Sequence, residues 1–341
     1  MALHTQPRPI VGIDIGGTLM KMVLEDGTDA HNRHPLVSFI RNQSQQADTS
    51  LLLAGWRRTT FSRPVEGSSK QQFWALLIPT ADIEQMMAAV EDQGPATGGR
   101  LRVAATGGGV LKHKGDLERR LGVDLAVVKE LPATAHGLLI DSSQGAGTQL
   151  LLCNIGTGIS LATMDAQGEV ERISGSGIGG TTFWALVKRL TKFTSFDQAL
   201  VAGFQSGEAS KADTLVEDIY GRETSKEIGL PPDLVAGFLG KLDREDLSDA
   251  DVAAALLRML VSNVGQLAVF QARLLKVDTV WFTGGFVQSV GSQDHGGVDA
   301  TEIAQQAVTE AVSFWSAGAV HARFPPNAAL LGAMGAIHIA P

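Results

Sequence analysis

The sequence contains a single cysteine among its 341 residues, so Cys153 cannot form a disulfide bond within the chain. Closely spaced cysteines and the His-x-x-x-His spacing are both missing, which argues against a zinc site. Cys153 lies in an apolar run, where a free cysteine is typically a core residue and not a nucleophile. This cysteine content fits a reducing compartment, and we therefore expect a cytoplasmic location.

Charge and long hydrophobic runs are also scarce. Charged residues make up 19% of the chain and give a net charge of -8, which disfavours nucleic acid and anionic membranes as partners. No stretch has 18 unbroken apolar residues, and the polar N-terminus does not have the pattern of a signal peptide, so we expect no membrane partner. Hydrophobic residues make up 44% and are spread along the chain, which predicts a globular protein of two domains.

Glycine is abundant, and its 39 residues cluster at the ends of apolar runs. One pattern occurs twice, at residues 9–24 and 149–164: a buried strand, a glycine turn and a returning strand. In each copy a polar residue, Asp14 or Asn154, stands near the end of the first strand. The repetition predicts an internally duplicated chain with two similar lobes.

The rest of the chain mixes strands with a mostly helical second half. The periodicity predicts strands at 70–77, 100–105, 277–282 and 319–324, and helices at 79–90, 181–190, 195–204, 211–220, 252–275, 304–315 and 328–337. Residues 41–69 have the least regular pattern. The longest predicted helix, 252–275, carries more apolar residues than one helical face needs, so we expect part of it to pack against a second subunit.

The first glycine turn has the composition of a phosphate site. Gly16 and Gly17 leave backbone N–H groups unobstructed, and such a concave cluster of donors binds phosphate oxygens. Asp14 at its base is suited to hold Mg²⁺ through water, while Thr18 and Lys21 add a hydroxyl and a cation. An ordinary β-hairpin is the alternative interpretation of this segment taken alone.

Two further glycine turns follow later strands. Asn154, with Gly156, Thr157 and Gly158, forms a neutral turn suited to the β- and γ-phosphates of a nucleotide. Gly284-Gly285 would let a base or ribose lie against the backbone. Each of these turns, considered singly, is equally compatible with a plain hairpin or strand-to-helix connection.

The order of the three turns resembles the phosphate-1, phosphate-2 and adenosine motifs of the acetate and sugar kinase, heat-shock chaperone and actin superfamily. More specifically, the chain resembles type II pantothenate kinase, the eukaryotic-like class, from about residue 10 to residue 338. Five segments in the family's order carry this resemblance: Thr106-Gly107-Gly108-Gly109, 173–184, Ser195-Phe196-Asp197, Asp218-Ile219-Tyr220-Gly221 and 314–318.

The resemblance implies an α/β fold of two duplicated ribonuclease-H-like lobes with an ATP cleft between them. The lobes would comprise residues 1–140 and 141–341, the second with dimerisation helices of a homodimer. The implied ligands are ATP, Mg²⁺ and pantothenate, with coenzyme A or acyl-coenzyme A as a feedback ligand. The implied nucleotide-binding residues are Asp14, Gly16, Gly17, Thr18, Lys21, Gly107, Gly108, Asn154, Gly156, Thr157, Gly158, Gly179, Gly180, Gly284 and Gly285.

The resemblance also places the chemistry. Glu130 matches the family's catalytic glutamate, and a carboxylate there can accept the proton of an attacking hydroxyl. Taken alone, a glutamate at a helix start is explained by the helix dipole. Arg172 matches an arginine that contacts the acid substrate and the transferring phosphoryl group, for which a planar fork of donors is suited. Ser160 and Gly175 are the other implied substrate residues.

Several residues depart from the family's pattern. Lys129 stands where an acidic residue is usual, and segments 237–240 and 325–327 differ near the expected substrate-tail and dimer regions. Two alternatives to a pantothenate kinase therefore stay open. One is a kinase of the same fold for another small hydroxyl compound, and the other is a nucleotide-binding regulator that hydrolyses ATP slowly.

Overall fold

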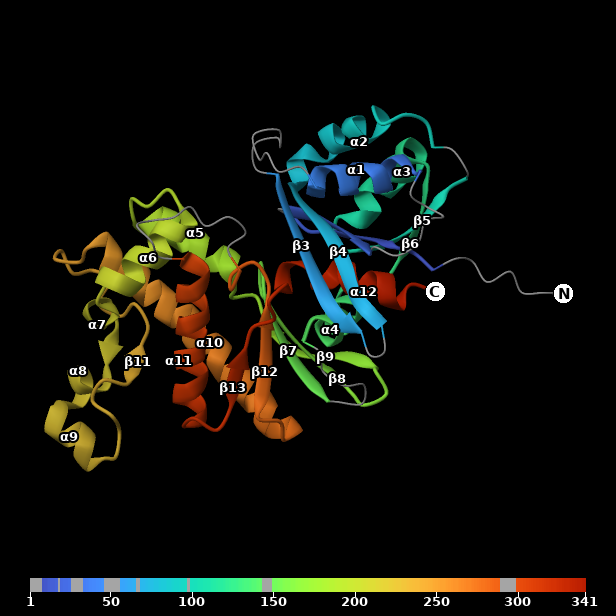
Figure 1. The fold of residues 1–341 in the computed structure, drawn as a ribbon. Helices are drawn as coiled ribbons and strands as arrows, with labels where there is room; N and C mark the ends of the chain where they lie inside the picture. Colours follow the sequence, from blue (N-terminus) through green and yellow to red (C-terminus); the bar gives the residue numbers. More distant parts are fainter. Residues whose placement is uncertain are drawn as a thin grey trace. The chain divides into compact units, whose positions relative to one another are not determined.

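The computed structural model describes residues 8–17, 19–25, 33–45, 56–65, 68–96, 99–142, 149–288 and 299–341, so Thr18 lies outside the described residues. The chain forms two compact units (Figure 1). The first comprises Met1–Thr148, Met164–Glu171 and Pro325–Pro341, and the second comprises Gln149–Thr163 and Arg172–Phe324. A single boundary after residue 140 differs from this division, because the C-terminal segment packs with the first unit.

The first unit contains a six-stranded mixed sheet in the order β3-β4-β2-β1-β5-β6. Strand β1 pairs antiparallel with β2 and parallel with β5, which is in turn parallel to β6. The strands are β1 (Val11–Ile15), β2 (Leu19–Glu25), β3 (Arg57–Val65), β4 (Ser68–Pro79), β5 (Leu101–Thr106) and β6 (Val123–Val127). The predicted first hairpin is confirmed, and β3 gives part of the irregular 41–69 segment a regular structure.

Alternation along β1 divides the first unit into two layers. Val11, Ile13 and Ile15 are fully buried in a core shared with three helices on one face of the sheet, α1 (Pro35–Gln45), α2 (Ile83–Glu91) and α3 (Val110–Leu121). Gly12 and Asp14 point to the opposite face, toward α12 (Leu331–Ile339), which packs on α4 (Glu130–Ser142) (Figure 1). The period of two therefore places Asp14 on the α12 side of the sheet.

The second unit repeats this plan. Its sheet has the order β13-β12-β7-β8-β9, with β12 parallel to both β7 and β13. The strands are β7 (Leu150–Ile155), β8 (Ile159–Met164), β9 (Val170–Ser176), β12 (Thr279–Thr283) and β13 (His321–Arg323). In both sheets the first strand has its hairpin partner on one side and two strands that run parallel to it on the other side. The predicted α/β fold of duplicated ribonuclease-H-like lobes is therefore confirmed.

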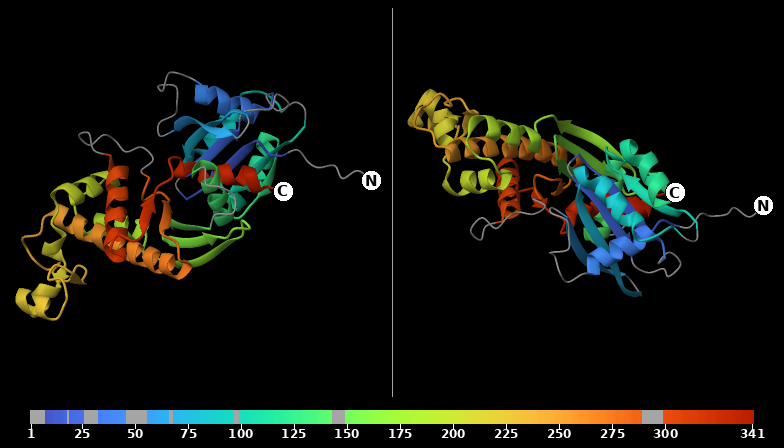
Figure 2. Two further views of the ribbon diagram at one scale, coloured as in Figure 1. Left: turned by 60° about the horizontal axis from the view of Figure 1, so that its bottom comes forward. Right: turned by 90° about the horizontal axis from the view of Figure 1, so that it is seen from above.

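Helices cover the core of the second unit (Figure 2). They are α5 (Gly180–Leu190), α6 (Phe196–Ser206), α10 (Asp249–Leu275) and α11 (Ala300–Ser316). Helix α10 is the predicted long helix, and it packs against α5, α6 and α11. By length and composition α10 could also cross a membrane, but 67% of its apolar window is buried within the protein, as expected for a core helix. Cys153 is fully buried in the same core.

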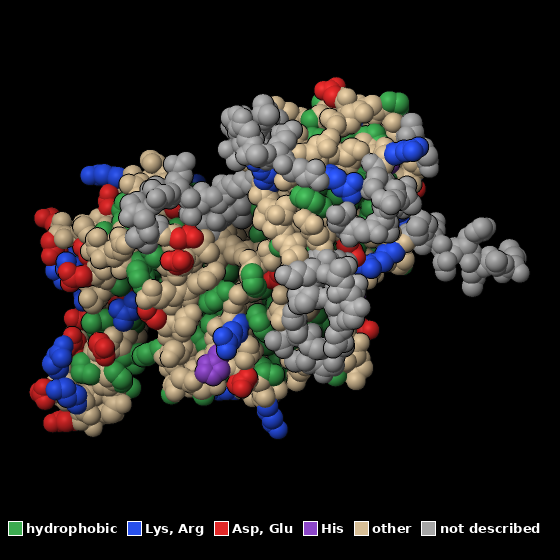
Figure 3. Space-filling model, in the orientation of Figure 1, with side chains coloured by type: hydrophobic (Ala, Val, Ile, Leu, Met, Phe, Trp, Pro, Cys, Tyr) green, Lys and Arg blue, Asp and Glu red, His purple; other side chains and the backbone are tan. Residues whose placement is uncertain are grey.

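The predicted helix at 211–220 is wrong. The chain instead forms α7 (Ala209–Ala212), the short strand β10 (Thr214–Leu215) and α8 (Val216–Tyr220), followed by α9 (Arg222–Glu227). β10 pairs with β11 (Val235–Gly237), and buried Asp213 accepts a hydrogen bond from Leu239 N at 2.8 Å. These long-range contacts override the local helical pattern. Charged side chains of both signs lie among hydrophobic ones over this region (Figure 3).

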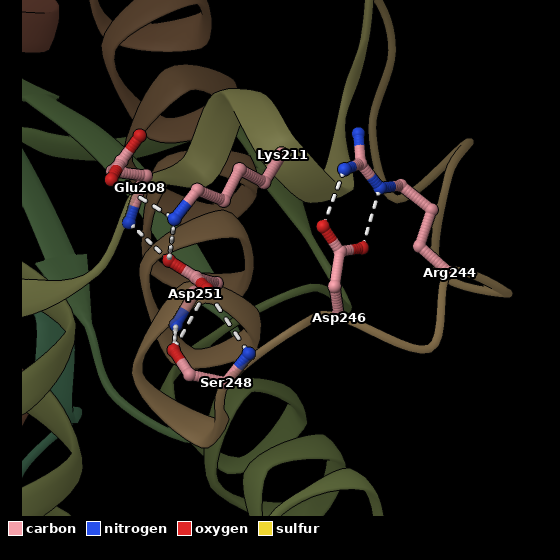
Figure 4. A network of polar contacts seen from close by, with 6 residues as sticks. All are labelled: Glu208, Lys211, Arg244, Asp246, Ser248 and Asp251. Atoms are coloured by element: carbon pink, nitrogen blue, oxygen red, sulfur yellow. Dashed lines mark hydrogen bonds and ion pairs between the residues drawn. The ribbon is translucent and has the colours of Figure 1, made fainter.

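A polar network fixes the start of α10 (Figure 4). Asp251 is almost fully buried and accepts hydrogen bonds from Glu208 N at 2.7 Å, Ser248 N at 3.0 Å and Ser248 Oγ at 2.7 Å. The Lys211 Nζ atom lies 3.8 Å from Asp251 Oδ1. Burial alone would raise the pKa of Asp251, but these donors outweigh it and the pKa lies below its usual value.

We expect Asp251→Ala to destabilise the second unit by about 1–3 kcal/mol at pH 7, because two part-buried N–H groups and the Ser248 hydroxyl lose their acceptor. The folded-state pKa is lowered, so the contribution of Asp251 is present above about pH 4 and is lost as the pH falls. Urea unfolding at several pH values measures this. Asp246→Ala, which breaks the exposed Arg244 pair of the same network, should change stability little; equal losses in both variants would contradict the assignment.

Candidate active site

Asp14 is the charged centre of the first unit. It lies near the end of β1 with only 8% of its surface exposed. Its Oδ2 atom accepts a hydrogen bond from Lys21 Nζ at 2.9 Å, from the facing position on β2. A cation at this distance offsets part of the hydration that a nearly buried carboxylate loses. Lys21, predicted as a phosphate ligand, is therefore first of all the counter-ion of Asp14.

The turn after Asp14 is fixed from both sides. Gly16 N donates to Leu19 O at 2.9 Å, and Thr80 Oγ1 donates to Gly16 O at 2.9 Å. Gly17 is exposed, and a Cβ built on it would have no heavy atom within 4 Å. Hydrogen bonds therefore hold the backbone at Gly16, while Gly17 is accessible to a ligand, as a phosphate-binding turn requires. Thr80 has no motif around it, so its contact with this turn could not be predicted from the sequence.

A second glycine turn, which follows β5, lies against Asp14. Gly107 follows β5 with φ of +94°, a left-handed conformation that favours glycine. A Cβ built on it would lie 2.5 Å from both Asp14 Oδ1 and Ile15 O. The neighbouring Gly108 is open, with no heavy atom within 4 Å of a built Cβ. The structure therefore brings the predicted Gly107 to Asp14 and leaves the adjacent backbone accessible.

Glu130 begins α4, in the same unit as Asp14. The residue is exposed, yet its pKa is raised, first by partial burial of the carboxylate and then by the charge of Asp14, while Lys21 acts to lower it. The charges of Asp14 and Lys21 therefore both act on the predicted base. A raised pKa makes a carboxylate a stronger proton acceptor, provided that it is still ionised at the working pH.

The donor set around Asp14 suits magnesium better than a metal that needs a full protein cage. In the described part of the chain no three His, Cys, Asp or Glu side chains gather as a metal site. Mg²⁺ commonly uses one or two carboxylates, water and substrate phosphates. One Asp14 oxygen accepts the Lys21 hydrogen bond, and the other lies against Gly107, next to the open Gly108, so this single carboxylate fits a hydrated Mg²⁺.

The second unit assembles the neutral turn as predicted. Gly156 N donates to Gly158 O at 2.9 Å, and Gly180 N donates to Gly156 O at 2.8 Å. A Cβ on Gly179 would lie 2.6 Å from Thr157 O, so the start of α5 packs directly on the turn. Gly156 to Gly158 and Gly179-Gly180, separated in sequence, thus form one backbone-rich surface in which Thr157 is exposed.

The third turn repeats the arrangement around Asp14. Gly284 has φ of +100°, and a Cβ on it would overlap Asn154 Oδ1 and lie 2.5 Å from Ile155 O. Gly107 stands in the same relation to Asp14 and Ile15. The duplication therefore extends to the turn after the neighbouring parallel strand, and Gly285 is the open counterpart of Gly108.

The predicted substrate residues also meet in the second unit. Arg172 lies on β9, and its Nε donates to Ser160 Oγ on β8 at 2.9 Å. A Cβ on Gly175 would overlap the Arg172 guanidinium, so glycine there gives this side chain its path across the strands. Arg172 is exposed, and its bond to Ser160 leaves the terminal nitrogens available to an acidic ligand.

A cavity of about 540 Å³ also lies in the second unit, between α6, α10, α11 and the segment around β11. Its lining is mainly apolar and includes Phe204, Phe238 and Trp315. Arg258 adds a charge, although its guanidinium donates to Asp233 O at 3.2 Å. Segment 237–240 stands out in the sequence, but the cavity could not be predicted from it, because the cavity walls come from elements far apart in the chain.

The sequence of this chain matches a known protein family. The Fumble family model matches residues 10–146 and 141–338. The chain belongs to the Fumble family. This finding confirms the resemblance to type II pantothenate kinases that the glycine turns and the 173–184 segment indicated.

Individual relatives share about a third of their aligned residues. Pantothenate kinase 1 of Arabidopsis thaliana is 34% identical over 70% of this chain and 65% of that protein. A 4'-phosphopantetheine phosphatase of Mus musculus is 34% identical over 69% of this chain and 30% of that protein. The chain thus spans only part of these relatives. A solved ROK family glucokinase from Streptomyces griseus, in complex with glucose and AMPPNP, is 15% identical with a TM-score of 0.49, over 97% of this chain and 98% of that one.

The structure thus gathers the predicted residues into two clusters. The first unit holds Asp14, Lys21, the two turns and Glu130, and the second holds Asn154, its turns and Arg172 with Ser160. The roles of these residues stay predictions.

We expect Arg172→Lys to impair both KM and kcat for pantothenate, the substrate that the resemblance implies. Lysine keeps the charge but loses the planar fork that bonds Ser160 while presenting further donors, so kcat/KM should fall roughly 10–100-fold. Steady-state kinetics measures this, with Arg189→Lys, at an exposed position of α5, as the control. Unchanged constants in Arg172→Lys would place this side chain outside the site.

Proposed function

We propose that this protein is an ATP-dependent kinase that phosphorylates the primary hydroxyl of pantothenate to 4'-phosphopantothenate, the first step of coenzyme A biosynthesis. Membership of the Fumble family and a relative named pantothenate kinase support the substrate. The observation that carries the proposal is Glu130 at the start of α4, electrostatically coupled to Asp14 in the phosphate turn. A phosphate turn alone serves any nucleotide-binding protein, whereas a base beside it serves transfer to a hydroxyl.

In the proposed reaction the pantothenate hydroxyl oxygen attacks the γ-phosphorus of ATP. Its O–H proton passes to the Glu130 carboxylate, a P–O bond forms to pantothenate, and the bond between the γ-phosphorus and the bridging oxygen breaks to release ADP. Glu130 would later return the proton to solvent. The raised pKa of Glu130 fits this role because the acceptor must compete for the hydroxyl proton.

Other residues of the chain would bind and orient the reactants. Arg172 would hold the carboxylate of pantothenate and contact the phosphoryl group, with Ser160 fixing the guanidinium. The open backbones at Gly17 and Gly285 would approach the nucleotide. Asp14 would hold Mg²⁺ through water, and the bound ion would neutralise charge on the phosphates.

The two alternatives differ in what they require of these residues. A kinase for another small hydroxyl compound would keep Glu130 and differ only in the substrate pocket. A regulator with slow ATP hydrolysis would need the glycine turns but neither Glu130 nor Arg172. Turnover of a panel of alcohols, with ATP consumption as readout, distinguishes these possibilities.

Glu130→Gln tests the proposed base. The amide preserves size but cannot accept a proton, so kcat should fall roughly 10²–10⁴-fold while nucleotide affinity, measured by calorimetry, changes little. In the wild type, activity should decrease as the pH falls through a pKa above the ordinary 4.5 of glutamate, because protonation removes the base. The residual activity of the variant should lack this dependence.

The control for this experiment is Glu118→Gln on α3, because the Glu118 side chain accepts a hydrogen bond from Leu125 N at 3.1 Å, which the amide oxygen of glutamine can also accept. Dephosphorylation of 4'-phosphopantetheine should be assayed in parallel, because one relative carries that name. Glu130→Gln turnover within threefold of the wild type would end the base hypothesis.

We further infer a homodimer formed through α10 and α11. Most of the apolar surface of α10 is buried within its own unit, so the apolar composition of this helix does not by itself indicate an interface. Phe270 and Leu274 on α10 remain 45% and 74% exposed, and Phe314 on α11 is 61% exposed. Apolar residues of this size on adjacent helices support an interface. Feedback by coenzyme A or acyl-coenzyme A and a cytoplasmic location stay predictions.

Sedimentation should give twice the chain mass of 35.9 kDa at micromolar concentration. Leu274→Asp should shift the population toward monomer, because it places a charge in the apolar contact. Leu111→Asp changes a side chain that is 76% exposed on α3 of the first unit and should leave the mass unchanged. A wild-type mass near that of one chain would refute the dimer.

A further inference from the structure

Gly332, in the first turn of the C-terminal helix α12, lies against the charged centre of the first unit. A Cβ built on Gly332 would be 2.9 Å from Asp14 Oδ2, 3.1 Å from Asp14 Cγ and 3.4 Å from Asp14 Cβ. All three of its nearest atoms thus belong to one side chain. No motif in the sequence connects residue 332 with residue 14.

The oxygen that Gly332 faces is the one that accepts the Lys21 hydrogen bond. Gly107 faces the other oxygen, with a built Cβ 2.5 Å from Asp14 Oδ1. The carboxylate therefore lies between two glycines, one on each oxygen, with Lys21 fixing its direction. The second unit differs, because among its described glycines only Gly284 has Asn154 among the nearest atoms.

Helix α12 cannot move away to make room for a side chain at position 332. A Cβ on Gly335 would overlap Ala133 O of α4, and a Cβ on Gly137 of α4 would overlap Leu331 O. The two helix backbones are thus in direct contact. The movable atoms near residue 332 are those of the Asp14 carboxylate, which is the end of a short side chain.

We propose that Gly332 is a positioning residue. Because it has no side chain, the Asp14 carboxylate has room to keep the orientation that its hydrogen bond with Lys21 sets. The C-terminal helix is then part of the catalytic apparatus although it contributes no reacting group. A methyl group at position 332 would push Asp14 Oδ2 away from Lys21 Nζ. The carboxylate would then rotate away from the glycine turn that follows β1. The predicted loss of turnover rests on the proposed function, whereas the contact itself does not.

Close helix packing is the competing explanation for a glycine in α12. Gly335 and Gly137 serve that purpose, because their built Cβ atoms meet backbone atoms of the opposite helix. Gly332 instead meets side-chain atoms of a strand residue. The two explanations therefore predict different outcomes for alanine substitutions along the same helix.

The test compares three alanine variants. Gly332→Ala should keep the fold, because alanine favours a helix over glycine, yet lose at least tenfold in turnover and in the Mg²⁺-dependent part of ATP affinity. Gly335→Ala should lower the unfolding midpoint through its backbone clash. Gly115→Ala, at an exposed position of α3 with no heavy atom near a built Cβ, should raise the midpoint and leave turnover unchanged.

A double-mutant cycle on stability separates this proposal from the proposed function. In an Asp14→Ala background Gly332→Ala should raise the unfolding midpoint as much as Gly115→Ala does, because the methyl then has room; with Asp14 present the gain should be smaller or negative. Equal gains in both backgrounds would overturn the proposal, as would wild-type turnover in Gly332→Ala. If Gly332→Ala fails to fold, folding restored by Asp14→Ala supports the contact and failure in both backgrounds overturns it. A wild type without kinase activity would refute the function alone, because the cycle needs no substrate.

Discussion

The first unit is organised around the almost buried carboxylate of Asp14 and its ion pair with Lys21. Removing a carboxylate from water is costly unless a partner compensates, and Lys21 does so from the facing position of β2. The room for that carboxylate depends on glycines of two other elements, Gly107 after β5 and Gly332 in α12. The hairpin, the neighbouring parallel strand and the C-terminal helix therefore share one constraint.

The duplicated unit shows what happens when the charge is removed. Asn154 occupies the position of Asp14, and the hydrogen bond from Gly156 N to Gly158 O closes the second turn one residue earlier than the first, which places Ser160 where the first hairpin has Lys21. A neutral amide needs no cation, so a neutral residue can stand there. Gly284 still stands against Asn154 as Gly107 stands against Asp14, because that contact follows from the turn geometry and not from charge. The two turns thus keep one backbone plan with different electrostatics, as expected if one faces a metal and the other faces phosphate oxygens directly.

Local patterns in the sequence predicted most of the strands and the long helices of the second unit, because a glycine turn between apolar runs and a long amphipathic repeat are short-range signals. The helices α1, α3 and α4 of the first unit were not among the predicted ones. They failed at 211–220, where the buried carboxylate of Asp213 and pairing with β11 impose a strand on a helical pattern. The glycine turns were also found from sequence, while Thr80 and the cavity beside α10 were not. Those features depend on elements that meet only after folding, so no spacing along the chain announces them.

The return of the chain to the first unit explains why the C-terminal helix carries glycines that weaken it. Helix α12 must pass close to both α4, which begins with Glu130, and β1, which ends beside Asp14. Gly335 admits the first approach and Gly332 the second. Each glycine costs helix stability relative to alanine, by roughly 1 kcal/mol. The loss is tolerable because α12 is held by tertiary packing, and the packing in turn brings the ends of α4 and β1 into one electrostatic environment. The same contacts that stabilise the fold thereby link the helix that begins with the proposed base to the strand that carries the proposed metal ligand.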